Sequence, residues 1–160
     1  MASAEYKGIF GKAFRFLDIL LALAVAATFL EVLTEVFFRY ILDTPLSWGG
    51  ELSQTILVWI TFIGAAVMLY RGEHMVIDLL VQRISSPGAR KALRFAGSFA
   101  ILLFVLVGTI AGWQVVLRTW GMRTTAMQIP AGILYLAFPA GCVLMVFVVL
   151  RDLAALMRRT

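Results

Sequence analysis

The feature that most constrains the fold is a stretch without any charged residue, from Leu52 to Tyr70. A helix needs about 20 mostly apolar residues to cross the roughly 30 Å of hydrocarbon in a bilayer, because it rises about 1.5 Å per residue. The stretch has about that length, and Glu51 and Arg71 bound it. It therefore predicts one membrane-spanning helix.

Three other apolar stretches have the same character, and the four together take up most of the 160 residues. The chain is 62% hydrophobic and only 14% charged, whereas a soluble domain is about 25% charged. This composition leaves no room for a soluble domain. We predict an all-α integral membrane protein, a single domain over 1–160 with transmembrane helices near 17–40, 49–70, 94–118 and 130–150.

The N-terminal stretch shares some features with a secretory signal, since basic residues precede an apolar run that contains Ala24-Val25-Ala26. The apolar core of a signal is about 7 to 15 residues long. Here the apolar run continues as far as Phe38. We therefore expect an uncleaved first helix.

The positions of the basic residues predict the orientation in the membrane. Of the 14 lysines and arginines, all but Arg39, Arg118 and Arg123 fall on one side of the four predicted spans. Because basic residues are enriched in cytoplasmic segments, both termini are expected in the cytoplasm. The connections at 41–50 and 119–129 then face outward. The same asymmetry accounts for the net charge of +5 and gives no reason to expect nucleic acid as a partner.

Three charged residues recur at every fourth position in the first predicted span: Glu31, Glu35 and Arg39. This spacing puts them on nearly one helix face, where Glu35 and Arg39 can pair. Glu31 would lie about 15 Å from the helix end. An ionised side chain that deep costs on the order of 3 kcal/mol, so Glu31 should face protein or water. Three interpretations stay open: an internal contact with the second or third helix, a docking site for a partner, or a proton carrier.

The second predicted span carries two further candidate residues. Glu51 falls in its first turns, where the helix dipole favours a negative charge, and Ser47 precedes it as a candidate N-cap. Trp59 lies mid-span, away from the aromatic belt expected at the membrane boundary, and so predicts packing against another helix. The first two helices should form an antiparallel hairpin.

The segment after Tyr70 is too polar to span the membrane. Its polar residues at 71, 74, 78 and 82 have near-helical spacing, which predicts a short amphipathic helix at about 73–85 in the plane of the membrane surface. His74 and Asp78 are four residues apart, so a local pair is favoured over a ligand site. Pro87 is expected to help end this helix.

Glycines and prolines predict further details of packing. Gly108 and Gly112 form a GxxxG pattern, which we assign to packing among the four helices in preference to an external interface. Pro130 is expected to begin the last span, where its missing N–H is harmless. Pro139 lies inside that span and predicts a kink.

The sequence has no residue pattern for catalysis or cofactor binding. Its one histidine, His74, and its one cysteine, Cys142, cannot supply a zinc cluster or an intrachain disulfide. No GxxxxGK[ST] sequence is present to hold the phosphates of ATP. We therefore expect no catalytic residue, no metal site, no cofactor and no enzymatic activity, and any energy that the protein uses must come from elsewhere.

Several of these residues also occur in an order typical of one family. They are Trp48, Glu51, WITFIGAA at 59–66, Arg71, Gly72, His74 and Asp78, followed by Ile129, Pro130, Tyr135, Pro139 and Gly141. This order resembles the small, DctQ-like membrane subunit of tripartite ATP-independent periplasmic (TRAP) transporters. The resemblance covers residues 14 to 150. The chain departs from it at Gly50, where many relatives carry a second acid.

The resemblance implies a function. In TRAP systems a periplasmic binding protein captures a small organic acid, and a large multispan subunit carries it across the bacterial inner membrane by a sodium-driven elevator movement. The small subunit supports this movement as a scaffold, so no substrate-binding residue is expected here. The implied partners are the large subunit, the binding protein and membrane lipids. The alternative is a self-sufficient proton-coupled multidrug exporter that uses Glu31.

Overall fold

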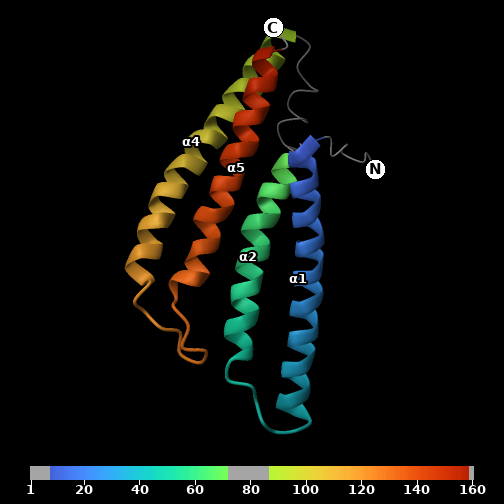
Figure 1. Ribbon diagram of the computed structural model, residues 1–160, viewed down its shortest axis with the longest axis vertical. Helices are drawn as coiled ribbons and strands as arrows, with labels where there is room; N and C mark the ends of the chain where they lie inside the picture. The colour runs from blue at the N-terminus through green and yellow to red at the C-terminus, as the bar shows by residue number, and fades with distance from the viewer. Residues whose placement is uncertain (1–7, 72–86, 159–160) are drawn as a thin grey trace.

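The computed structural model describes residues 8–71 and 87–158, which contain four helices (Figure 1). The helices are α1 (Gly8–Tyr40), α2 (Gly49–Tyr70), α4 (Pro87–Thr119) and α5 (Gly132–Arg158). Each includes a stretch long and apolar enough to cross a membrane, namely Gly11–Tyr40, Gly49–Tyr70, Phe95–Thr119 and Gly132–Arg151. The prediction of an all-α membrane protein with four spans is confirmed.

The four helices lie side by side in an open row, in the order α4, α5, α2, α1 (Figure 1). Among the described residues, α1 packs against α2, α2 against α5 and α5 against α4, and no other pair of helices has backbone contacts. The predicted antiparallel hairpin of α1 and α2 is present, and α4 and α5 form a second one. The two hairpins meet through α2 and α5, which run parallel.

Because the row is open, most side chains face outward. The buried share of the most apolar residues is 6% in α1, 11% in α2, 22% in α4 and 33% in α5. The outer surface of α1 carries large apolar side chains along its length, among them Phe16, Leu23, Phe29 and Phe37. Lipid tails are as apolar as leucine, so such exposure carries little penalty in a bilayer.

Small residues let α5 approach both of its neighbours closely. A Cβ atom placed on Gly141 would lie 2.7 Å from Cβ and 2.8 Å from the carbonyl oxygen of Phe62 in α2. On the other side, Cβ atoms on Gly108 and Gly112 of α4 would lie 3.1 and 2.8 Å from ring atoms of Phe138. The GxxxG pattern therefore serves packing between α4 and α5, as predicted.

Three helices extend beyond the predicted spans. α1 begins at Gly8 instead of 17, α4 at Pro87 instead of 94, and α5 continues to Arg158 instead of 150. The predicted limits follow the change in hydropathy, but a helix satisfies its own backbone and continues into polar surroundings where the residues favour helix. Pro87 is the first residue of α4, a position where its missing N–H is harmless.

One predicted N-cap and one predicted helix start are wrong, although α2 begins at Gly49 as predicted. The residue before α2 is Trp48, which makes no side-chain capping bond, so Ser47 is not the N-cap. Pro130 does not begin the last helix, because it pairs with Arg123 in an isolated antiparallel bridge and α5 starts at Gly132. Before α5 the pairing of the connecting segment, and not the local residue preference, sets where the helix begins.

Some predictions are not tested by the described residues. The in-plane helix at 73–85, with Gly72, His74 and Asp78, lies outside them. Pro139 lies inside α5, which continues as one helix on both sides of it, and the kink stays a prediction. The beginning of α1 and the end of α5 lie at the same end of the row (Figure 1), while their placement in the cytoplasm stays a prediction.

Candidate functional site

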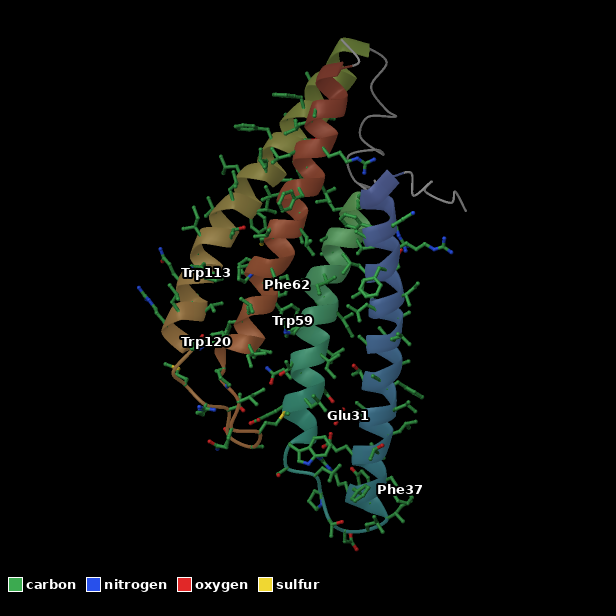
Figure 2. The ribbon with its side chains drawn as sticks, in the orientation of Figure 1. Glu31, Phe37, Trp59, Phe62, Trp113 and Trp120 are labelled. Carbon is green, nitrogen blue, oxygen red and sulfur yellow. The ribbon has the colours of Figure 1, made fainter. Side chains whose placement is uncertain are left out.

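The acidic residues of α1 converge on the beginning of α2. A Cβ atom placed on Gly49 would lie 2.9 Å from Glu31 Oε1 and 3.1 Å from Glu35 Oε2. One turn further along α2, the Ser53 hydroxyl donates a hydrogen bond to Glu31 Oε2. Figure 2 shows Glu31 between the two helices. We call Glu31, Glu35, Arg39, Gly49 and Ser53 the carboxylate cluster.

The carboxylate cluster holds two acids and one cation. Arg39 donates to Glu35 one helical turn away, whereas Glu31 Oε1 is buried and accepts no hydrogen bond from the described residues. Both acids lie at the beginning of α2, where the helix dipole favours negative charge. The contacts thus place the acidic stripe against the second helix. Docking and proton transfer stay hypotheses for these side chains.

Glu51 ties the connection between α4 and α5 to the beginning of α2. Its Oε1 accepts the backbone N–H of Ala126, and its Oε2 accepts that of Met127, each at 2.8 Å. We call this pair of hydrogen bonds the Glu51 latch. Hydrogen bonds to an ionised carboxylate are shorter and stronger than those between neutral groups. The latch therefore fixes the position of the connection relative to α2.

The latched connection also makes hydrogen bonds within itself. The backbone N–H of Thr124 donates to the carbonyl of Ile129 at 2.9 Å. Arg123 donates from its guanidinium to the carbonyl of Gln128 at 2.8 Å, and Gln128 has a φ of 55°. The Arg123 side chain is exposed, so a positively charged group is held in a defined position at this end of the row.

Trp59 packs against another helix, as its position in mid-span predicts. Its indole Nε1 donates a hydrogen bond to the carbonyl of Ile133 in α5 at 3.2 Å. The bond satisfies the indole N–H, which would find no acceptor among lipid tails. One turn further along α2, the ring of Phe62 meets that of Phe138 edge to face, with centroids 5.1 Å apart. Figure 2 shows Trp59 and Phe62 on the side of α2 that faces α5.

At the opposite end of the row, a salt bridge and an aromatic stack join three helices. Arg71 donates to Asp18 of α1 at 2.6 Å. The rings of Phe14 and Tyr70 stack with centroids 4.0 Å apart, and the guanidinium of Arg151 lies 4.8 Å from the centroid of the Tyr70 ring. Of the predicted interfacial motif, only Arg71 lies within the described residues.

Sequence reasoning missed three members of these contacts: Asp18, Gly49 and Ser53. Two glycines in succession at a helix start lower helix stability unless close approach requires them, so the pair at 49 and 50 was a usable signal. Asp18 was visible as a charged residue just inside the predicted span 17–40, where it needs a partner. Ser53 had no such signal.

Within the described residues, no group of three or more histidine, cysteine, aspartate or glutamate side chains is placed to hold a metal ion. Cys142 is free and buried, with its Sγ 3.3 Å from the position that a Cβ on Gly108 would take. The contacts of Glu31, Glu51, Trp59 and Asp18 each join one helix to another helix or to a connection. The arrangement therefore holds helices in register.

Comparison with known proteins gives one family. The family model described as "Tripartite ATP-independent periplasmic transporters, DctQ component" matches residues 28–159. The C4-dicarboxylate TRAP transporter small permease protein DctQ of Rhodobacter capsulatus is 33% identical over 104 residues, which are 64% of this chain and 45% of that protein. The sialic acid TRAP transporter small permease protein SiaQ of Vibrio cholerae is 24% identical over 140 residues, which are 87% of this chain and 80% of that protein.

A third relative is much longer than this chain. The sialic acid TRAP transporter permease protein SiaT of Haemophilus influenzae is 25% identical over 126 residues, which are 76% of this chain and 20% of that protein. The match therefore spans less than half of the Rhodobacter protein and one fifth of the Haemophilus protein. The family match includes the carboxylate cluster, the Glu51 latch and Trp59. The chain belongs to the family of DctQ components of tripartite ATP-independent periplasmic transporters.

Proposed function

We propose that this chain is the small scaffold subunit of a sodium-coupled TRAP transporter that takes up a small organic acid across the bacterial inner membrane. It assembles with a large elevator-type membrane subunit and works with a periplasmic binding protein. Family membership supports a role in such a transporter. The relatives are named for C4-dicarboxylates, sialic acid and ectoine, which supports a small carboxylate-bearing substrate.

The observation that carries the scaffold role is the open row of four helices. A subunit that moves within the bilayer needs a static membrane domain beside it. A row of helices enlarges such a static domain with few residues. The close contact of Gly141 with Phe62 and the bond from Trp59 to α5 fix the centre of the row. The row is thus suited to contact the moving large subunit without changing its own shape.

The Haemophilus relative supports assembly with a large partner. The region similar to this chain makes up one fifth of that permease protein, so in that relative it is joined covalently to a much longer polypeptide. A separate small chain with the same fold would make the corresponding contacts between subunits. The partner expected for this chain is therefore a large membrane protein.

The distribution of basic residues supports cytoplasmic termini. The two short connections then face the periplasm, and the second of them is held by the Glu51 latch. A binding protein that arrives from the periplasm would meet these connections first. We assign them a role in docking, with Arg123 as an exposed positive charge.

Reconstitution tests the proposal. The chain, tagged at its C-terminus, is purified from its own membrane, and a far larger membrane protein is expected to copurify. Vesicles with both membrane proteins and the binding protein are expected to accumulate the organic acid only under an inward sodium gradient. Vesicles that lack this chain should show little uptake.

Three results would count against the proposal. Full uptake without the chain would exclude the scaffold role, and uptake driven by protons without sodium would exclude the coupling. Vesicles that contain only this chain and extrude a cationic drug under a proton gradient would support the exporter that uses Glu31. The Glu31→Gln variant, measured in the same vesicles, tells whether that carboxylate carries the proton.

A further inference from the structure

A half-polar pocket lies next to the Glu51 latch, at the end of the row where α2 and α5 begin. Its volume is about 220 Å³. Three segments form its walls: the first turns of α2, the first turn of α5 and the connection that precedes α5. The residues that decide its chemistry are Glu51, Gln54, Thr124, Thr125, Leu134 and Tyr135.

Glu51 brings a negative charge into this pocket that no cation among the described residues balances. Its hydrogen-bond donors are all neutral: the backbone N–H groups of Ala126 and Met127, with smaller contributions from the Thr124 hydroxyl and the Thr125 backbone N–H. The salt bridges found among the described residues join Arg39 to Glu35 and Arg71 to Asp18, and neither involves Glu51. The full negative charge of Glu51 therefore remains without a cationic partner among the described residues.

The other lining groups add acceptors and an apolar wall. Gln54, Thr125 and Tyr135 are exposed at the rim, where an amide and two hydroxyl oxygens can accept hydrogen bonds. Ile129 and Leu134 supply apolar surface inside. The ligand that fits this combination is a small cation with several N–H donors, carried on a short apolar stem.

The position of the pocket identifies the source of such a ligand. The spans in α2 and α5 begin at Gly49 and Gly132, so the pocket lies where these spans reach the membrane surface. Lipid headgroups occupy that level at high local concentration. We propose that the pocket binds the primary ammonium group of a phosphatidylethanolamine-type lipid, with Glu51 as the charged acceptor. A choline headgroup carries the same charge on a bulkier trimethylammonium group that has no N–H donor, so it does not satisfy these acceptors.

Lipid titration of the purified full chain in detergent micelles tests the proposal. Short-chain phosphatidylethanolamine, phosphatidylcholine and phosphatidylglycerol are added separately, and bound lipid is counted by native mass spectrometry while the melting temperature is followed. Phosphatidylethanolamine is expected to bind saturably and raise the melting temperature, and the other two lipids to do neither. Equal effects of the ethanolamine and choline lipids would overturn the proposal.

Variants locate the binding. Glu51→Gln is expected to abolish the preference for the ethanolamine lipid, but it also disturbs the latch. Gln54→Leu leaves the latch intact and is expected to weaken binding about five-fold, the effect of losing one net hydrogen bond. Gln114→Leu, an exposed glutamine in α4 outside the pocket, is the matched control and should bind as the wild type does.

The variants also provide outcomes that contradict the proposal. Unchanged preference in both Glu51→Gln and Gln54→Leu would place the lipid elsewhere. No lipid preference in the wild type, together with loss of the copurifying large protein in Glu51→Gln, would assign the pocket to a basic side chain of a partner protein instead. The lipid readouts need neither transport nor the large protein, so their failure is separable from failure of the proposed function.

Discussion

The carboxylate cluster predicts a large difference between two adjacent glycine substitutions. Gly49→Ala places a methyl carbon 2.9 Å from Glu31 Oε1, about 0.5 Å closer than ordinary contact at 3.4 Å, while a Cβ on Gly50 meets nothing within 4 Å. Glu31 and Glu35 are held by Ser53 and Arg39, so neither moves away freely. Overpacking costs about 1–3 kcal/mol, and because the clashing atoms are the ends of two glutamate side chains, we expect a value at the lower end of this range.

Gly50→Ala is the matched control because it makes the same chemical change at the next residue. Replacing glycine with alanine where the backbone allows it stabilises by about 0.4–1 kcal/mol, through the lower entropy of the unfolded chain. Gly50→Ala should therefore melt slightly above the wild type and Gly49→Ala below it. A difference of about 2 kcal/mol between them corresponds to about 4–8 °C for a chain of this size.

Thermal unfolding in detergent micelles, followed by circular dichroism, measures this difference. Adding Glu31→Ala to Gly49→Ala removes the nearest clashing atom and should recover stability, with a coupling of about 0.5–3 kcal/mol in the double-mutant cycle. Equal melting temperatures for Gly49→Ala and Gly50→Ala, or a cycle without coupling, would refute the packing of the carboxylates against Gly49.

Three further predictions concern the acidic residues of α1, the contact between α2 and α5, and the connection between α4 and α5. Replacing Glu31 or Glu35 with leucine should weaken assembly or uptake without changing the order of preferred substrates, and an altered order in competition assays would contradict a scaffold role. Gly141→Ala forces α2 and α5 apart and should lower the free energy of unfolding by about 1–3 kcal/mol. Gly64→Ala is the control, because a Cβ there meets nothing within 4 Å. Equal melting temperatures for the two variants would contradict the close contact between Gly141 and Phe62. Arg123→Glu should weaken docking of the binding protein in a surface plasmon resonance assay, and unchanged affinity would remove that residue from the docking surface.

The four spans could be predicted from the sequence because length and hydropathy are local properties. The charged residues of α1 could be assigned to one face for the same reason, since their spacing alone determines it. The order of the helices in the row could not. It depends on which surfaces fit, and the fit of Gly141 against Phe62 joins residues with no local signal of their partnership.

Glu51 shows a second limit. Its position in the first turns of a helix predicts a favourable site for a negative charge, and that much is evident from the sequence. Its partners, however, are the backbone N–H groups of Ala126 and Met127, which every residue except proline possesses. When the partners of a side chain are backbone groups, the residue types of the distant segment do not indicate the contact. Only the folded chain reveals this contact.

A layer one helix thick has a consequence for solute movement. A route that carries a hydrophilic molecule through a bilayer must be enclosed on every side, because hydrocarbon will not accept it. The described residues of this chain, arranged in a single layer, can line such a route on one side only. Any conduit beside it takes its remaining walls from another polypeptide, so permeation past these helices is a property of the assembled complex.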